Sequence, residues 1–158
     1  MGTSAGNSRV AQYFFEDFQP GQRFPGTPRT LDEAAFRLFA QMTGDAHPLH
    51  YDPEYAKATR FGAPLAHGLL LMALTALGAG SLSPHVEDSM IAFLDQSGRF
   101  VKPVLLGETV TPELEVAETR LSRGGTTGIV KFAARLVNQR GETVLEGQHT
   151  YLIKRKRA

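Results

Sequence analysis

The densest group of reactive side chains lies in one short segment, Gly44-Asp45-Ala46-His47-Pro48-Leu49-His50-Tyr51-Asp52. This segment holds two of the five histidines of the chain, together with two aspartates. A carboxylate and an imidazole are the usual pair for moving a proton near neutral pH. Because Pro48 lies between Asp45 and His50, the chain can curl so that both side chains converge on one water molecule. We therefore predict that Asp45 and His50 are a catalytic acid–base pair.

Two other interpretations of this segment remain open. Aspartate and proline are common turn and capping residues, so the segment can simply connect two helices. For Asp52 this capping role is a sufficient explanation. Asp45 and the His47-x-x-His50 spacing also offer the ligands of a metal site. However, His47 and His50 need not face one site across a proline, and no distant cluster completes a coordination shell, so we expect no metal.

A second feature stands at the start of the longest apolar run, in Pro64-Leu65-Ala66-His67-Gly68-Leu69. No Ser, Thr, Asp or Asn directly precedes this run, so its first amides lack an obvious side-chain cap. Gly68 has no side chain to shield its N–H, which suits it to bind a developing oxyanion. Alternatively, Gly68 only permits close packing. Its place 18 residues after His50 favours a substrate-binding role, whereas His67 is interpreted as mostly structural.

Three helices are expected to position these groups. Thr30 and Glu33 form a capping-box pattern, and Gly44 is a natural helix stop, so Asp45 should follow the first helix directly. Asp52-Pro53-Glu54 is a typical start of a second, short helix that ends near Arg60. The third, over residues 68–79, is apolar on every side and should therefore be buried on all sides.

The second half of the chain predicts strands. Apolar and polar residues alternate over 110–116 and 130–136, and further strands are expected over 90–104 and 143–154. Glycine-containing turns at 123–125 and 139–141 join consecutive strands into an antiparallel sheet. A wholly apolar helix and such a sheet predict an α+β architecture, the hotdog fold, in which a curved antiparallel sheet wraps around a long apolar central helix.

The composition predicts a soluble globular protein. A length of 158 residues, with 42% apolar and 21% charged residues, suits a single domain. We expect a disordered N-terminus over 1–12, one domain over 13–154 and a basic tail over 155–158. The absence of cysteine excludes thiolate catalysis and disulfides, and it is compatible with a cytoplasmic location.

The charge distribution indicates no nucleic-acid-binding face. Four basic residues lie in Lys154-Arg155-Lys156-Arg157, and removing them from the total of 17 leaves 13 basic against 16 acidic residues. The rest of the chain is thus slightly acidic. The terminal run alone resembles a nucleic-acid patch, but a solvated terminus is its commoner fate. No segment is long and apolar enough to span a membrane, and no signal peptide is recognisable.

The spaced motifs resemble the signature of MaoC-like R-specific enoyl-CoA hydratases. The matching residues are Gly44-Asp45-x-x-Pro48-x-His50-x-Asp52, Phe61-Gly62-x-Pro64-x-x-His67-Gly68 and Arg99-Phe100-x-Lys102-Pro103-Val104-x-x-Gly107-Glu108-Thr109. The resemblance extends from about Phe18 to Ile153. One departure is His47, where the family commonly has asparagine.

The resemblance implies a function and a role for each predicted site residue. Asp45 and His50 would activate the water that attacks the β-carbon of a trans-2-enoyl-CoA, and the Gly68 N–H would stabilise the enolate. No metal and no redox cofactor would be needed, and the partner would be an acyl-CoA or acyl-carrier-protein thioester. The family also implies a homodimer or a dimer of dimers. The alternatives are a hotdog thioesterase and a non-catalytic acyl-thioester-binding subunit.

Overall fold

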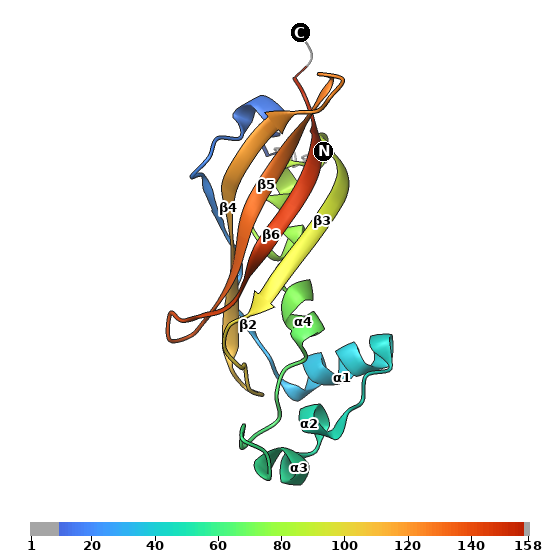
Figure 1. The fold of residues 1–158 in the computed structure, drawn as a ribbon, viewed down its shortest axis with the longest axis vertical. Coiled ribbons are helices and arrows are strands. Elements are labelled where there is room, and N and C mark those ends of the chain that lie inside the picture. The colour runs from blue at the N-terminus through green and yellow to red at the C-terminus, as the bar shows by residue number, and fades with distance from the viewer. Residues whose placement is uncertain (1–9, 157–158) are drawn as a thin grey trace, which may run out of the picture.

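The computed structural model describes residues 10–156, which form a curved sheet with helices at one end and along one face (Figure 1). The helices are α1 (Glu33–Thr43), α2 (Pro48–Tyr51), α3 (Pro53–Lys57) and α4 (Gly68–Ala73). The strands are β1 (Arg23–Pro25), β2 (Arg29–Thr30), β3 (Met90–Phe100), β4 (Thr109–Leu121), β5 (Thr127–Asn138) and β6 (Thr143–Lys154). Short 3-10 turns are η1 (Phe15–Asp17), η2 (Leu77–Ala79) and η3 (Ser83–His85).

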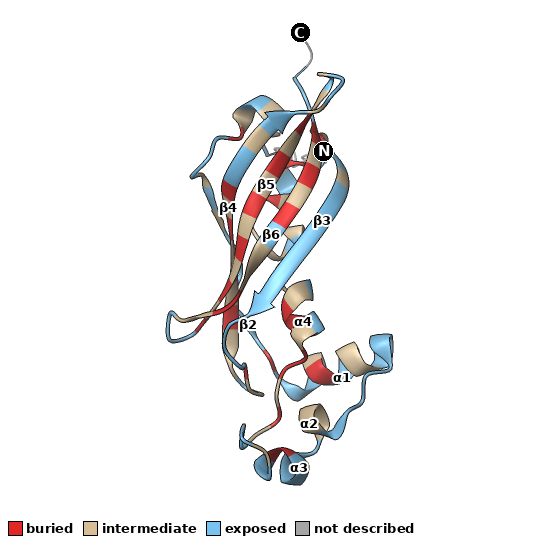
Figure 2. Ribbon diagram, viewed as in Figure 1, coloured by how far each residue is buried: buried red, intermediate tan, exposed pale blue. Residues whose placement is uncertain are grey.

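The sheet is antiparallel and has the strand order β1-β4-β5-β6-β3, with β2 also paired to β4. Alternate residues of β5 are buried along its whole length, as Figure 2 shows by its red bands. Their side chains face α4 and the turns that follow it, which lie behind the sheet in Figure 1. This confirms the predicted α+β class and the antiparallel sheet.

The start of α1 differs from the prediction, whereas its end agrees with it. The predicted capping box at Thr30 is wrong, because Thr30 lies in β2 and its hydroxyl bonds to that of Thr109 at 2.8 Å. Asp32 caps α1 instead, and its carboxylate accepts from the Ala35 N–H at 2.9 Å. Gly44 does end α1 with φ of 76°, the left-handed conformation that glycine adopts without strain.

The central helix is much shorter than the predicted span of 68–79. It ends at Ala73, and the Thr75 hydroxyl donates to the Met72 carbonyl at 2.7 Å. A side chain that binds a nearby backbone carbonyl competes with continuation of the helix. The expectation of burial on all sides is also wrong, because Leu69 is 69% exposed. Only one face of α4 packs against the sheet, through Leu70 and Leu71.

Several short elements had no clear sequence signal. Strands β1 and β2 and helix α2 contain only two to four residues each, too few to establish a period. Pro112 of β4 lies opposite the gap between β1 and β2, where its carbonyl accepts from the Gly26 N–H at 2.8 Å.

Both ends of the domain are held by polar contacts. The expected disorder over 1–12 falls mainly on residues 1–9, which lie outside the described residues. Within the described part, Gln12 donates to the Pro84 carbonyl at 2.7 Å. Arg155 and Lys156 form ion pairs with Glu16 and Asp17 in η1. Among residues 10–156, no helix is long and apolar enough to cross a membrane.

Candidate active site

The structure brings Asp45 and His50 together at the helical end of the molecule. Asp45 directly follows the helix stop at Gly44, and His50 lies in α2, which begins at Pro48. Side-chain oxygen or nitrogen atoms of Asp45, His50 and a third residue, His67, all lie within 4.8 Å of one another. The two residues predicted from the sequence therefore share one cluster with a histidine that was interpreted as structural.

A backbone carbonyl fixes the protonation pattern of His50. Its Nδ1 atom lies 2.5 Å from the carbonyl oxygen of Leu65. Because a carbonyl can only accept, Nδ1 must carry the hydrogen, and the lone pair of the neutral ring is then on Nε2. Leu65 is itself anchored, since its N–H donates to the Leu49 carbonyl at 3.2 Å. A backbone acceptor of this kind has no signature in the sequence.

His67 is the most deeply buried member of the cluster, with 2% of its surface exposed. Its ring stacks on that of His50, with centroids 3.7 Å apart and planes inclined by 25°. Its Nε2 atom lies 2.9 Å from the Tyr51 hydroxyl and 3.3 Å from the Asp45 carbonyl oxygen. Burial, with a further contribution from the charge of His50, lowers the pKa of His67 below its ordinary value. The neutral ring is therefore favoured.

Gly68 is the first residue of α4, and no side chain caps this helix. Within residues 10–156 its N–H has no hydrogen-bond acceptor. A Cβ atom at this position would lie 2.7 Å from the Cζ atom of Phe100, so the absence of a side chain permits close packing. The amide is also free to bind a ligand. Both interpretations made from the sequence are compatible with this geometry.

Two cavities lie near the cluster, one lined by His50 and the other by Gly68, which follows His67 in the chain. One, of about 310 Å³, is lined by His50 and Tyr51 together with residues of α1. The other, of about 330 Å³, is lined by Gly68, Phe100, Arg60 and Lys102. A thioester that binds beside Gly68 would therefore have basic side chains nearby.

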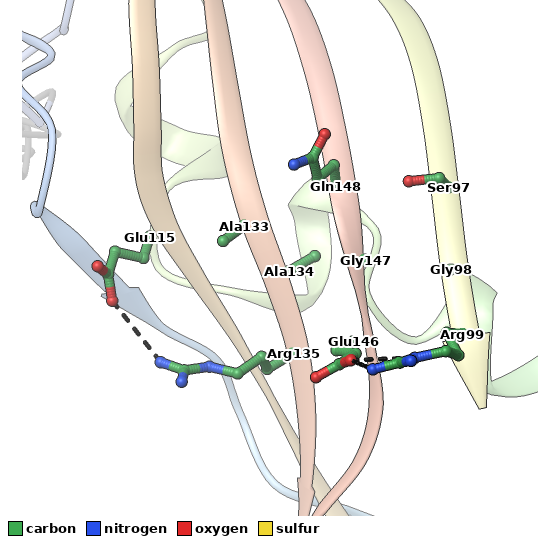
Figure 3. Close-up of a pocket in the computed structure, with 10 residues that line it drawn as sticks. All are labelled: Ser97, Gly98, Arg99, Glu115, Ala133, Ala134, Arg135, Glu146, Gly147 and Gln148. Atoms are coloured by element: carbon green, nitrogen blue, oxygen red, sulfur yellow. Dashed lines mark hydrogen bonds and ion pairs between the residues drawn. The ribbon is translucent and has the colours of Figure 1, made fainter. Parts of the chain in front are cut away.

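A larger hollow of about 600 Å³ lies on the sheet, away from the cluster (Figure 3). Small residues of β3, β5 and β6 form its floor. Its two arginines already face carboxylates, Arg99 with Glu146 and Arg135 with Glu115 at 3.6 Å. No histidine lines it. The Asp45 cluster is therefore a better candidate for acid–base chemistry than this hollow.

The same cluster is the place in the described chain where a metal ion could find ligands. It differs from the metal alternative considered from the sequence, because His47 does not take part. The His47 Nδ1 atom instead accepts from the Leu49 N–H at 3.2 Å and caps α2. Within the cluster, His67 Nε2 is engaged with the Tyr51 hydroxyl. A metal at His67 Nε2 would have to displace this contact.

Comparison with known proteins places the chain in a family. Residues 17–137 match the model described as MaoC like domain. The chain belongs to the MaoC-like family. The (R)-specific enoyl-CoA hydratase of Aeromonas caviae is 34% identical over 115 residues, which cover 73% of this chain and 81% of the relative. The enzyme of the same name from Rhodospirillum rubrum is 30% identical over 146 residues, covering 89% and 92%.

The MaoC-like chain also has relatives with other names. The mesaconyl-CoA hydratase of Cereibacter sphaeroides is 30% identical over 158 residues, which cover 99% of this chain but only 43% of that protein. The family resemblance predicted from the sequence is confirmed, and it indicates an enzyme of the hydratase and dehydratase class.

Solved structures agree with the fold. An Archaeoglobus protein described as a monoamine oxidase regulatory protein has a TM-score of 0.87 and 36% identity, covering 94% of this chain and 99% of the other. A Mycobacterium tuberculosis protein with a double hotdog fold has a TM-score of 0.73 and 22% identity, covering 92% and 45%. The latter likeness concerns the fold alone. The MaoC-like chain thus has the predicted hotdog fold, with a shorter central helix than expected.

Proposed function

We propose that this MaoC-like chain reversibly adds water to a trans-2-enoyl thioester and forms the R-3-hydroxyacyl thioester. The observation that carries the proposal is the cluster of Asp45 and His50, whose side-chain atoms lie within 4.8 Å of each other. The hydrogen bond from His50 Nδ1 to Leu65 leaves the Nε2 lone pair as the basic atom of the ring. A carboxylate and an imidazole lone pair can together hold and polarise one water molecule.

The proposed reaction needs only this water and the substrate. The water oxygen attacks the β-carbon while Asp45 and His50 take up its proton. The electron pair of the double bond moves towards the thioester carbonyl, and a proton is then delivered to the α-carbon on the same face. One new C–O bond and one new C–H bond account for both parts of the water. No external oxidant or reductant is required.

Gly68 is the proposed donor to the enolate oxygen. Its N–H has no acceptor among the described residues, and it belongs to the residue that follows His67, whose ring contacts His50. Because α4 has only six residues, its dipole is short, and the proposal rests on the single amide. A preorganised donor of this kind stabilises charge that develops in the transition state.

The substrate class is proposed as an acyl-CoA thioester, with acyl-carrier-protein thioesters as the variant. The names of the (R)-specific enoyl-CoA hydratases from Aeromonas caviae and Rhodospirillum rubrum support CoA. Arg60 and Lys102 line the cavity beside Gly68, which is compatible with a phosphate-bearing carrier. We expect no dependence on metal, so activity should survive incubation with a chelator.

The test uses crotonyl-CoA as a probe, with wild type and Asp45→Asn compared. The enoyl absorbance should disappear without release of free CoA thiol, and Asp45→Asn should be at least about a hundredfold slower. Release of thiol in step with substrate loss would instead identify a thioesterase. Binding of crotonyl-CoA without turnover would identify a non-catalytic acyl-thioester-binding module. Either outcome would overturn the hydratase proposal.

We also propose that the chain forms a homodimer through β3. Among the described strands, β3 pairs only with β6 and is therefore an edge strand, and Figure 2 shows it pale blue and thus exposed over most of its length. Six large apolar residues of β3 and its end are 42% to 52% exposed, namely Met90, Ile91, Phe93, Leu94, Phe100 and Val101. An apolar edge strand is a template for pairing with another chain. A second copy related by a twofold axis would satisfy both edges at once.

A further inference from the structure

We propose that Tyr51 and His67 are positioning residues, which hold the side chains of Asp45 and His50 in the relative position that the reaction needs. The inference rests on the proposed function and extends it to two side chains that the acid–base mechanism does not itself use.

Tyr51 ties the Asp45 loop to the first helix. Its hydroxyl lies 3.1 Å from the carbonyl oxygen of Phe36 and 3.1 Å from that of Asp45. Phe36 is in α1 and is 1% exposed, so packing in the core fixes the position of its carbonyl. Asp45 itself lies in an exposed loop, and its side chain is 51% exposed. The Tyr51 hydroxyl therefore links the Asp45 backbone to the buried part of the molecule, together with His67 Nε2, which lies 3.3 Å from the same carbonyl.

The hydrogen bonds around Tyr51 select one tautomer of His67. Two carbonyls compete for the single hydroxyl hydrogen, so the hydroxyl oxygen is available as an acceptor. His67 Nε2, 2.9 Å away, can then donate to it. The His67 Nδ1 atom is buried and has no partner within the described residues. Because a buried N–H without an acceptor is costly, the hydrogen belongs on Nε2 and the unpaired atom is a lone pair.

In this tautomer the neutral ring of His67 packs flat against the ring of His50. The two rings are 3.7 Å apart, and Phe39 packs on His67 at 4.6 Å between centroids. A neutral His67 allows His50 to gain a proton during the reaction without a second positive charge beside it. The titratable groups that contact the His67 ring are Asp45, Tyr51 and His50. The Asp45 carboxylate lies 3.9 Å from His67 Nε2. The next titratable group is His47, whose ring centroid is 6.2 Å from that of His50.

The first test compares Tyr51→Phe with Tyr151→Phe as its matched control. The Tyr151 hydroxyl also faces a buried histidine, with its oxygen 3.4 Å from His149 Nδ1, but Tyr151 packs in a different part of the core, with Phe132. Both variants should remain folded, with the larger loss of thermal stability in Tyr51→Phe, because the Tyr51 hydroxyl makes three contacts of 2.9 to 3.1 Å. Only Tyr51→Phe should lose about tenfold or more in kcat, because small misplacement of reacting groups is costly. Its KM should stay within about twofold, since the proposed donor to the thioester, the Gly68 N–H, is unchanged.

The second test addresses His67 directly, in case Tyr51→Phe fails to fold. His67→Gln keeps an N–H donor near the Nε2 position, whereas His67→Met has a similar volume and no donor. The glutamine variant should retain the greater kcat. In addition, ¹⁵N spectra of the wild-type histidines should place the hydrogen on Nε2 in His67 and on Nδ1 in His50.

The outcomes separate this inference from the function beneath it. If wild type hydrates crotonyl-CoA and Asp45→Asn does not, but Tyr51→Phe matches Tyr151→Phe in kcat, the positioning role is refuted and the hydratase stands. Equal kcat of His67→Gln and His67→Met, or an Nδ1–H tautomer of His67, would likewise refute it. If wild type has no hydratase activity, the proposed function fails and this inference fails with it.

Discussion

The role of the Gly68 amide can be tested by removing one hydrogen. Gly68 is the first residue of α4, a position at which proline is favoured in helices. The preceding residue, His67, has φ of −63° and ψ of 138°, the extended conformation that a residue before proline adopts. Gly68→Pro should therefore delete the N–H while the backbone keeps its course. Gly68→Ala is the matched control, because it adds a Cβ atom and keeps the N–H.

Phe100 must be changed at the same time to make this comparison fair. Any Cβ at Gly68 would lie 2.7 Å from Cζ and 2.9 Å from Cε2 of Phe100, well inside contact distance. The Phe100 side chain is at the surface, and the residue is 52% exposed, so Phe100→Ala removes the clash with little loss of core. Both Gly68 variants are therefore made in the Phe100→Ala background, where they differ from each other mainly in the amide hydrogen.

The expected difference follows from the known value of such donors. Loss of one oxyanion donor costs about a hundredfold to a thousandfold in kcat, or about 2.7 to 4 kcal/mol of transition-state stabilisation. Turnover of crotonyl-CoA should therefore be lower by that factor in the proline double variant than in the alanine double variant, with similar melting temperatures. Equal turnover of the two proteins would refute the assignment of Gly68 as the oxyanion donor.

Three further predictions concern His50, His149 and the β3 edge. His50→Asn and His50→Ala should both lose at least about a hundredfold in kcat. Only His50→Ala should also lose about 1 kcal/mol in the free energy of unfolding measured with urea, because asparagine can still donate to the Leu65 carbonyl. Wild-type turnover by either variant would contradict the mechanism. Burial lowers the pKa of His149 from its ordinary 6.5, so this histidine binds a proton more readily in the unfolded chain. The free energy of unfolding should therefore fall as the pH drops below 6.5. An equally steep fall in His149→Gln would contradict this. Leu94→Lys should convert a dimer to a monomer in light scattering, whereas Leu121→Lys, similarly exposed on β4, should not; a dimer that persists in Leu94→Lys rules out the β3 interface.

The sequence was most informative where a motif is contiguous. Asp45 and His50 were predicted as a pair because Gly44 and Pro48 are local signals that end one helix and begin the next turn. Such signals act within a few residues and do not depend on tertiary packing. The alternating strands β4 and β5 were predicted for the same reason, since their period reflects one buried and one exposed face.

The sequence prediction was wrong about α4 and missed contacts between distant residues. The length of α4 was overestimated because an apolar pattern that tolerates Thr75 does not reveal that its hydroxyl binds the Met72 carbonyl. Burial of Leu69 was wrong because the pattern cannot tell a central helix from one that packs on a single face. His67 and Tyr51 lie 16 residues apart, so their hydrogen bond had no local sign.

The contacts of the two histidine rings favour opposite tautomers, which suits the different roles proposed for them. The Leu65 carbonyl fixes the hydrogen of His50 on Nδ1, whereas the Tyr51 hydroxyl and the Asp45 carbonyl favour the hydrogen of His67 on Nε2. The remaining lone pairs then differ in access. The lone pair of His67 is on the buried Nδ1 atom, which has no partner among residues 10–156, while His50 lines a cavity. In the proposed mechanism His50 is thus the base and His67 its support, and exchange of these roles would require moving a backbone carbonyl and a tyrosine together.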